Sequence, residues 1–349
     1  MLVREQVPLA PLTTLRVGGP ARYFVEARSE AEAGEAADFA HSRQLPLFVL
    51  GGGSNLVVAD AGFAGLVLKV GITGVSRSTP SERIVLFTAG AGIDWDALVE
   101  RAVEANCAGT ECLSGIPGTV GGTPVQNVGA YGQEVSETIR EVQVLDLHSM
   151  RAKTFSNADC GFQYRSSIFN TTERERYIIL RVSFALREGA KPNISYPDLR
   201  NFFAGHAGEP TLSRVRAAVR EIRHRKAMLI VPGDDDARSA GSFFKNPVVP
   251  ESFYEELSTR LMSRGLKLPG YPVADGFLKL PAAWLVEQAG FAKGYTKGRA
   301  GISGKHALAI INRGGATAAE IVALKDEIAA RVHEVFGIEL APEPVFVGF

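Results

Sequence analysis

The stretch of residues 114–132 constrains this chain more than any other feature of its sequence. It reads SGIPGTVGGTPVQNVGAYG and consists mostly of glycine, proline and small residues. Glycine lets a backbone or a ligand approach closely, but it leaves few side chains with which to build a core. A loop of this length in a compact domain is usually functional. We therefore expect it to wrap a flat ligand or a pyrophosphate, with Asn127 and backbone groups bonding to polar ring edges.

A second glycine-rich loop, residues 51–55 (GGGSN), follows the short apolar run 47–50. The run predicts a buried strand, and the glycines predict a tight turn after it. Glycine N–H groups can converge on an anion, and Ser54 and Asn55 add side-chain donors, so the loop suits a phosphate. A plain strand–turn–strand corner explains the same residues equally well. The loop lacks the dinucleotide fingerprint, because Leu56 occupies the third glycine position.

Hydrophobic periodicity and capping residues predict a mixture of strands and helices. The helix expected over 212–229 is dense in arginine, and we expect most of its charges to form a solvated face. Another helix over 281–288 should stop at Gly290. Further helices are expected to start after the N-caps Ser29 (capping box with Glu32), Asp94 and Thr317 (capping box with Glu320). Strands are expected over four other runs, residues 66–70, 84–89, 142–147 and 177–186. The pattern indicates an α+β protein with several sheets.

Composition narrows the class of protein. A chain of 349 residues should fold as two or three domains. Lysine plus arginine (38) balances aspartate plus glutamate (38), which disfavours nucleic-acid and membrane-surface partners. No apolar run reaches the roughly 20 residues of a membrane-spanning helix, and the N-terminus does not resemble a signal peptide. Three cysteines without CxxC spacing fit reduced thiols in the cytoplasm, and six scattered histidines predict no metal site.

Three further residues could carry chemistry, although each has an ordinary explanation. The guanidinium of Arg165 is a fork of donors suited to a carboxylate or an enolate, but an isolated arginine more often forms a surface salt bridge. Ser242 lies between glycine and two phenylalanines, where a hydroxyl could sit in a dry pocket. It has no GxSxG elbow, so a serine hydrolase is poorly supported. Glu343, near the C-terminus, would ordinarily be a surface carboxylate.

Taken together, these segments resemble the UDP-N-acetylenolpyruvoylglucosamine reductase family. The resemblance covers essentially the whole chain, and seven motifs follow in the family's order: TTLRVGGPA, LGGGSNL, SGIPGTVGGTPVQNVGAYG, CGFQYRSSIF, GSFFKNPVV, ADGFLKLPAAWLVEQAG and PEPVFVG. The segment ISYPDL, residues 194–199, resembles the tyrosine-bearing substrate loop of the type I members. One small departure is Pro344, where many members have valine, so the backbone around Glu343 could differ.

The resemblance implies an α+β fold in which two subdomains of the PCMH/vanillyl-alcohol-oxidase type clasp FAD and a C-terminal α+β domain binds substrate. The first FAD-binding subdomain is expected over residues 1–72, and the second over 73–208 together with 338–349. The substrate-binding domain is expected over 209–337. Histidine and cysteine, the usual covalent attachment points, are missing from the flavin loops apart from nearby Cys112, so we expect non-covalent FAD. The implied FAD contacts are Gly51, Gly52, Gly53, Ser54, Asn55, Ser114, Gly115, Ile116, Pro117, Gly118, Gly121, Gly122, Asn127, Gly129, Ala130 and Tyr131.

The family's chemistry gives the remaining residues a role. NADPH reduces the flavin, and flavin N5 passes a hydride to the vinyl carbon of UDP-N-acetylglucosamine enolpyruvate, which yields UDP-N-acetylmuramate for peptidoglycan. By resemblance, Arg165 and Glu343 stabilise the enolate, with Glu343 protonated or acting through a network. Ser242 donates the proton, and Lys245 is a candidate to support it. The implied substrate contacts are Tyr196, Lys226, Asn246, Tyr271, Lys279 and Glu287.

Two alternatives remain open beside this reading. A flavin oxidase of the same fold would pass electrons to oxygen and ignore an enolpyruvyl substrate. A nucleotide-sugar binding or regulatory protein could have kept the scaffold and lost catalysis, but it would be expected to lack Arg165, Ser242 or Glu343, and all three are present. We expect a cytoplasmic monomer with small-molecule substrates.

Overall fold

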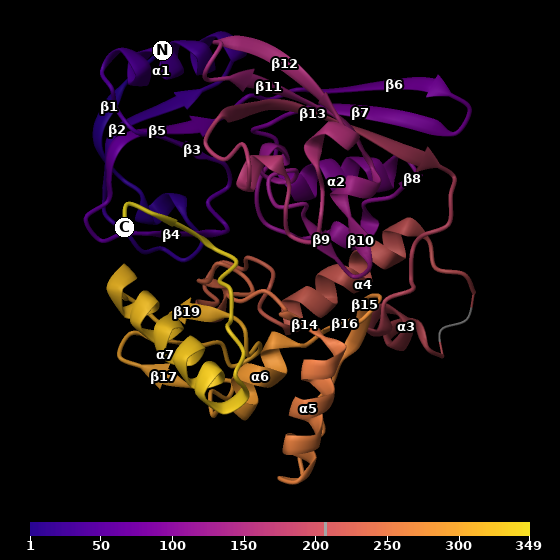
Figure 1. Cartoon of the computed structure of the whole chain (residues 1–349). Coiled ribbons are helices and arrows are strands. Elements are labelled where there is room, and N and C mark those ends of the chain that lie inside the picture. Colours follow the sequence, from indigo (N-terminus) through magenta and orange to yellow (C-terminus); the bar gives the residue numbers. More distant parts are fainter. Residues whose placement is uncertain (206–207) are drawn as a thin grey trace. The chain divides into compact units, whose positions relative to one another are not determined.

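The computed structural model describes residues 1–205 and 208–349, so that His206, one of the six histidines, lies outside the described residues. The chain divides into two compact units (Figure 1). The segments of unit 1 are Met1–Pro8, Pro20–Gly53 and Phe63–Leu229, and those of unit 2 are Leu9–Gly19, Ser54–Gly62 and Ile230–Phe349. The second glycine-rich loop is thus divided after Gly53.

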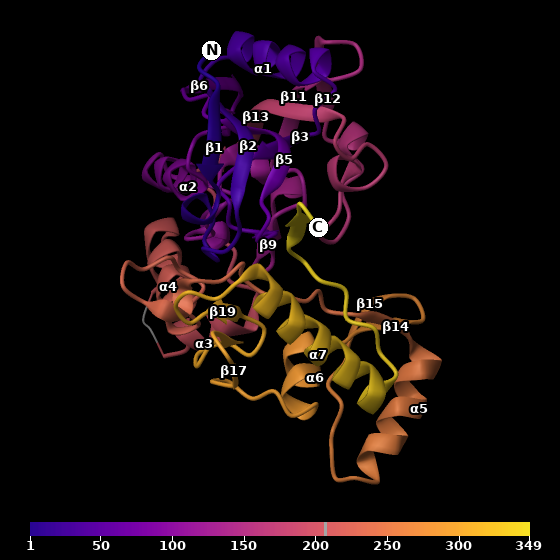
Figure 2. The same ribbon diagram turned by 90° about the vertical axis from the view of Figure 1, so that its left-hand side faces the viewer.

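The first sheet of unit 1 has the strand order β1-β2-β5-β3. Strand β1 (Arg4–Pro8) is antiparallel to β2 (Pro20–Ala27), whereas β5 (Phe63–Val70) runs parallel to both β2 and β3 (Leu47–Leu50). Parallel strands of one sheet need a crossover connection, and α1 (Glu30–Ser42) provides the one from β2 to β3, which lie on either side of β5. Its buried face consists of alanines, which let it pack closely on β2 and β5 (Figure 2).

The second sheet of unit 1 is antiparallel, with the order β12-β11-β13-β7-β6 and a short strand β8 paired with β13. The predicted strands all occur in these two sheets. Helix α2 (Trp95–Glu104) packs against the second sheet, with Trp95 and Phe184 ring centroids 5.5 Å apart. The strands are β6 (Val75–Ser81), β7 (Ile84–Gly90), β8 (Cys107–Ala108), β11 (Ile139–Asp146), β12 (Arg151–Ser156) and β13 (Tyr177–Glu188).

Unit 1 is completed by a hairpin and two helices. Strands β9 (Gly129–Ala130) and β10 (Gln133–Glu134) form the hairpin at the end of the long glycine-rich loop. Helices α3 (Pro197–Phe203) and α4 (Leu212–Arg225) share a small apolar cluster with Cys112.

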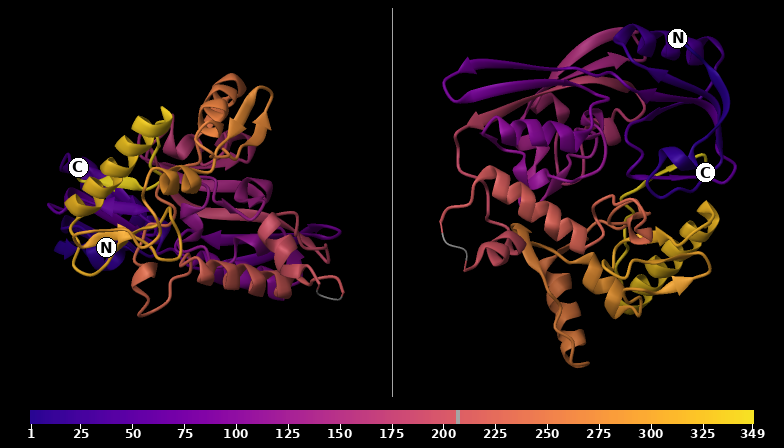
Figure 3. Two further views of the ribbon diagram at one scale, coloured as in Figure 1. Left: turned by 90° about the horizontal axis from the view of Figure 1, so that it is seen from below. Right: turned by 180° about the vertical axis from the view of Figure 1, so that it is seen from behind.

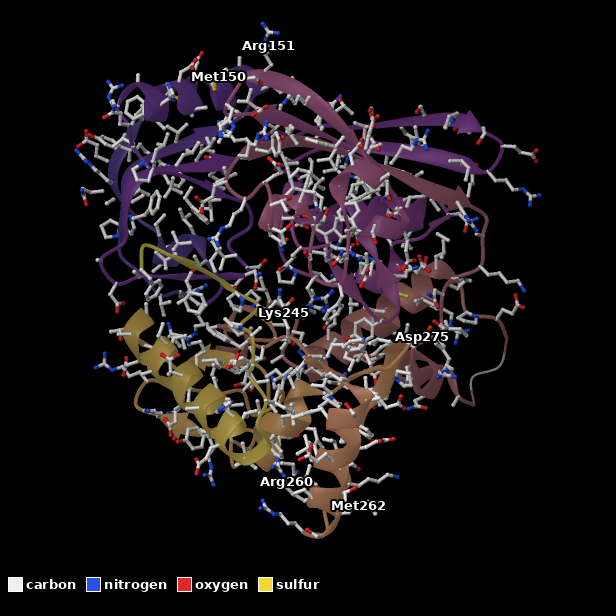
Figure 4. All side chains as sticks on the ribbon, in the orientation of Figure 1. Met150, Arg151, Lys245, Arg260, Met262 and Asp275 are labelled. Atoms are coloured by element: carbon white, nitrogen blue, oxygen red, sulfur yellow. The ribbon has the colours of Figure 1, made fainter. Side chains whose placement is uncertain are left out.

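Unit 2 contains three small sheets and three α-helices among its described residues. The predicted last helix, α7 (Ala318–Phe336), opens with the expected capping box of Thr317 and Glu320 and packs on β18 and β19 (Figure 3). Helix α6 (Ala282–Gln288) ends as predicted, because Gly290 adopts a φ of +101° just after it. The third helix is α5 (Glu251–Met262), and the end of α5 carries the exposed Met262 (Figure 4).

The strands of unit 2 are short and pair locally. The sheets have the orders β14-β16-β15, β17-β18-β19 and β20-β4, of which only the last is parallel. The strands are β4 (Leu56–Val58), β14 (Val248–Pro250), β15 (Tyr271–Ala274), β16 (Phe277–Lys279), β17 (Thr296–Lys297), β18 (Ala300–Ile302), β19 (Ile310–Asn312) and β20 (Val345–Val347).

The predicted helix starts are correct, with one difference in detail. Ser29 accepts a hydrogen bond from the Glu32 N–H, as a capping residue does. The Glu32 carboxylate, however, accepts from the N–H of Arg28 and not from that of Ser29, so the capping box is only half formed. In the described part of the chain, no helix is long and apolar enough to cross a membrane.

Candidate functional site

The two glycine-rich loops meet within unit 1. A Cβ atom on Gly52 would lie 2.5 Å from the Cα of Gly118, closer than real Cβ atoms come to a backbone. A Cβ atom on Gly51 would lie 3.0 Å from Oγ1 of Thr119. The backbones of the two loops therefore approach each other so closely that only glycine fits, an arrangement that suits a site for an anionic ligand. The sequence predicts both loops but not their contact, and Thr119 is missing from the predicted ligand contacts.

The middle of the long loop is fixed to the segment that enters α2. The N–H of Trp95 donates to the Gly118 carbonyl at 3.1 Å, and the N–H of Gly121 donates to the Ala91 carbonyl at 2.9 Å. A Cβ atom on Gly121 would lie 2.6 Å from the Cβ of Ala91, so glycine is required there as well. This pairing holds the loop backbone without using side chains.

The start of the loop is held by charged residues of α2 and α4. The Asp96 carboxylate accepts the Gly115 N–H at 2.6 Å and pairs with Arg216, whose Nη1 lies 2.5 Å from Oδ1. Arg220 pairs with the same carboxylate, and Arg223 donates from Nε to the Gly115 carbonyl at 3.1 Å. Burial alone would raise the pKa of Asp96, but the hydrogen bonds from Arg216 and Gly115 outweigh it and lower the pKa.

The expectation that the arginine-rich helix presents most of its charges to solvent holds for the exposed Arg214 and Arg225, but two of its arginines face inward. Arg216 and Arg223 are each only 9% exposed. They fall on the same helical stripe as Leu212, Val215 and Val219, which are also buried. A residue seven positions further along a helix returns to the same face. The spacing of these two arginines therefore indicates that both lie on the buried face, although their charge suggests a solvated one.

The side chain of Asn127 holds the loop together. Its Nδ2 donates to the Glu134 carboxylate at 2.7 Å and to the Gln163 carbonyl at 3.1 Å, and its Oδ1 accepts the Ser136 N–H at 3.1 Å. The residue is 1% exposed. The hydroxyl of Ser114 is likewise directed inward and donates to the Glu111 carbonyl at 2.6 Å. Neither residue therefore presents its side chain to a ligand.

Arg165 contacts the end of the long loop from a later segment of the chain. It occupies a tight turn in which Gln163 and Ser166 exchange backbone hydrogen bonds of 3.0 and 3.1 Å. Its φ of +54° is a left-handed conformation that is uncommon for arginine and that can mark a functional residue. Its Nη2 donates to the Gly129 carbonyl at 2.7 Å, so that the guanidinium is directed to the β9–β10 hairpin.

Two predicted substrate residues of unit 1 lie beside the same hairpin. The rings of Tyr131 and Tyr196 meet edge to face, with centroids 5.5 Å apart. Lys226, just after α4, forms an ion pair of 2.6 Å with Asp198 of α3. Burial raises the pKa of the Tyr131 hydroxyl, whereas the positive charges of Arg223 and Lys226 act in the opposite direction.

Unit 2 brings Ser242 and Glu343 into adjoining segments. The N–H of Glu343 donates to the Phe243 carbonyl at 2.9 Å, and Phe244 and Pro342 form an antiparallel bridge. Further along the same pairing, the N–H of Lys245 (Figure 4) donates to the Ala341 carbonyl at 2.9 Å. Ser242 and Glu343 are both half-buried.

Asn55 joins this part of unit 2 from the second glycine-rich loop. Its Nδ2 donates to the Glu343 carbonyl at 3.2 Å, and its own carbonyl accepts the Val345 N–H at 2.9 Å. The hydroxyl of Thr14 donates to the carbonyls of Ser54 and Ser239, the latter at 2.6 Å. Asn55, predicted as a phosphate ligand, thus bonds directly to the backbone of Glu343, which is predicted as catalytic.

The other predicted substrate residues of unit 2 fall into two places. Tyr271 and Lys279 are cross-strand neighbours in the β14-β16-β15 sheet, so their side chains share a face. The Asn246 Oδ1 accepts the Ala282 N–H at 2.9 Å and caps the start of α6. Glu287 is exposed near the opposite end of that helix, about 8 Å along its axis.

Comparison with known proteins agrees with this geometry. A family model described as "FAD binding domain" matches residues 21–149, which include the contact between the two glycine-rich loops. A second model, described as "UDP-N-acetylenolpyruvoylglucosamine reductase, C-terminal domain", matches residues 233–347, which include Ser242 and Glu343.

Similarity to individual proteins extends over the whole chain. The UDP-N-acetylenolpyruvoylglucosamine reductase of Thermobifida fusca (strain YX) is 46% identical, covering 99% of this chain and 98% of that protein. The protein of the same name from Streptomyces coelicolor is 44% identical, over 99% and 90% of the two chains. The crystal structure of the reductase (MurB) from Thermus caldophilus aligns with a TM-score of 0.67 and 27% identity, over 99% of this chain and 100% of that one.

Proposed function

Since this chain belongs to the family of UDP-N-acetylenolpyruvoylglucosamine reductases, flavin-dependent oxidoreductases of peptidoglycan precursor synthesis, we propose that it uses FAD and NADPH to reduce UDP-N-acetylglucosamine enolpyruvate to UDP-N-acetylmuramate. The α+β fold, with an FAD-binding domain and the family's C-terminal domain, agrees with the prediction from sequence. The assignment of individual residues and of the three parts 1–72, 73–208 with 338–349, and 209–337 belongs to the proposal.

The contact between Gly52 and Gly118 is the observation that most supports the cofactor site. The two glycine-rich backbones approach so closely that no Cβ atom fits between them, as in loops that hold a pyrophosphate through backbone groups, so the residues present fit FAD. The cofactor is held non-covalently in this proposal. In support, burial raises the pKa of the Cys112 thiol, and the thiol donates to the Asn193 carbonyl, so it is a poor nucleophile for flavin attachment.

FAD, when bound, supplies hydride transfer from NADPH to the vinyl carbon of the enolpyruvyl ether. Negative charge then develops on the neighbouring carbon and its carboxylate. In the proposal, Arg165 directs its donors at that charge, and the Gly129 carbonyl and the tight turn keep the guanidinium oriented. Glu343 assists as a neutral carboxyl or through a network, because a bare carboxylate would repel the enolate.

Ser242 completes the reaction in this proposal by donating a proton to the carbon next to the ether oxygen. The pairing of Phe243 with Glu343 supports a shared role, because it keeps the serine and the carboxyl in adjoining segments. Tyr196 and Lys226 of unit 1, with Asn246, Tyr271, Lys279 and Glu287 of unit 2, are the proposed contacts to the UDP-sugar. The proposed enzyme acts as a monomer in the cytoplasm.

The variant Ser242→Ala tests this assignment. We expect anaerobic flavin reduction by NADPH to remain within about twofold of the wild-type rate, whereas turnover of the enolpyruvyl substrate falls by roughly 10²–10⁴-fold. The reason is that the proton is needed only after the hydride has left the flavin. Rapid-mixing measurement of each half-reaction separates the two effects, and equal losses in both would make Ser242 a structural residue.

A further inference from the structure

Glu111 is a buried carboxylate that none of the steps above uses. It is 1% exposed and lies in a short helical turn just before the long glycine-rich loop. Its Oε2 accepts the Gly109 N–H at 2.7 Å, and its Oε1 accepts both the Gln133 Nε2–H at 3.0 Å and the Asn193 N–H at 2.9 Å. One side chain therefore connects three chain segments through amide donors.

Asn193 carries this connection onward to the segment that leads into α3. Its Nδ2 donates to the Gly132 carbonyl at 3.1 Å, at the tip of the β9–β10 hairpin. Its Oδ1 accepts the Ser195 N–H at 2.9 Å and the Ser195 hydroxyl at 2.7 Å. The backbone and the side chain of Asn193 thus fix the turn immediately before Tyr196.

The hydrogen bonds of Gln133 attach the β9–β10 hairpin to Glu111 and its neighbour Cys112. Gln133, which is 4% exposed, donates to Glu111 and accepts the Cys112 N–H at 2.8 Å. A Cβ atom on Gly132 would lie 3.3 Å from the Ser195 Oγ and 3.8 Å from the Tyr196 Cβ, so the hairpin and the turn are in close contact. Tyr196 itself is 41% exposed, and its ring meets that of Tyr131 edge to face. The hydrogen bonds of Asn193 and Ser195 hold the turn that leads directly into it.

We propose that Glu111, together with Asn193, is a positioning residue for substrate binding. The carboxylate accepts hydrogen bonds from both the hairpin and the turn, and so sets the place of Tyr196 relative to Tyr131. This inference rests on the proposed role of Tyr196 in contacting the UDP-sugar. Neither Glu111 nor Asn193 touches the reacting atoms, so their effect is on substrate affinity.

The test is a double-mutant cycle on the FAD-loaded enzyme with Glu111→Gln and Tyr196→Ala. Glutamine keeps the size of the side chain but places an N–H group against another donor, because both carboxylate oxygens act as acceptors. We expect Glu111→Gln to raise KM for UDP-N-acetylglucosamine enolpyruvate about tenfold, equivalent to about 1.4 kcal/mol. FAD content and the rate of anaerobic flavin reduction should stay within about twofold of wild type. In the Tyr196→Ala background, the same change should leave KM unaltered.

Asn193→Ala is the second variant, should Glu111→Gln fold poorly. It keeps the backbone N–H that bonds to Glu111 but loses the side-chain bonds to Gly132 and Ser195, so it should reproduce the KM pattern. Glu104→Gln on the exposed side of α2 is the matched control and should change nothing. Additive effects of Glu111→Gln and Tyr196→Ala, or equal losses in FAD content and both half-reactions, would overturn the proposed role of Glu111. Neither result would contradict the proposed function. A Tyr196→Ala enzyme with wild-type KM would instead overturn the inference through the proposed role of Tyr196.

Discussion

At the scale of single residues, Arg165 joins an uncommon backbone conformation to a specific side-chain contact. A positive φ is disfavoured for arginine, and the surrounding structure maintains it through the Gln163–Ser166 pairing and the bond to Gly129. Lysine carries the same charge but lacks the planar fork of donors. The orientation of the guanidinium, rather than its charge alone, is therefore the property to test.

We expect Arg165→Lys to lower kcat for the enolpyruvyl substrate by roughly 10²–10³-fold, the usual effect of losing one donor to a developing anion. FAD content should not change. Steady-state kinetics with Arg174→Lys, an exposed arginine nearby in the sequence, provides the control. If the lysine enzyme turned over at the wild-type rate, a positive charge would suffice and the fork would have no role.

At the scale of elements, the two glycine-rich loops depend on each other. Gly52→Ala would place a methyl group 2.5 Å from the Gly118 Cα, so one loop must move. We expect the purified variant to have lost most of its FAD, as measured by the ratio of visible to ultraviolet absorbance. Gly34→Ala in α1 is the matched control, because its Cβ atom meets open space. It should keep FAD and gain up to about 1 kcal/mol of stability. A Gly52→Ala protein that keeps its full content of FAD would refute the proposed role of the two loops in binding FAD.

The attachment of α4 to α2 predicts a pH-dependent stability. The pKa of Asp96 is lowered in the folded protein, so the carboxylate stabilises the fold above its unfolded pKa of about 3.9. This contribution is lost as the pH falls through the lowered folded value. We expect Asp96→Asn to reduce the free energy of unfolding in urea by about 1–3 kcal/mol at pH 7. The difference from wild type should shrink towards pH 3, and a difference independent of pH would show that the charge is irrelevant.

At the scale of the whole molecule, local signals were predicted from sequence and contacts between distant segments were not. Ser29, Asp94 and Thr317 start helices as expected, because an N-cap acts within its own helical turn. The bond from Asn193 to Glu111 joins residues 82 positions apart, and no local pattern encodes it. The predicted roles of Arg165, Ser242 and Glu343 came from family motifs, since the surroundings of each residue in the sequence are also compatible with an ordinary structural role.

In the proposed reaction, one protein accepts electrons from NADPH and gives them to an enolpyruvyl UDP-sugar. The most direct test is to record the visible spectrum of the purified protein, add NADPH without oxygen, and then add UDP-N-acetylglucosamine enolpyruvate. We predict a flavin spectrum that bleaches with NADPH and recovers with the UDP-sugar. A colourless protein that cannot be reconstituted with FAD would contradict the account, and a reduced flavin that only air reoxidises would indicate an oxidase instead.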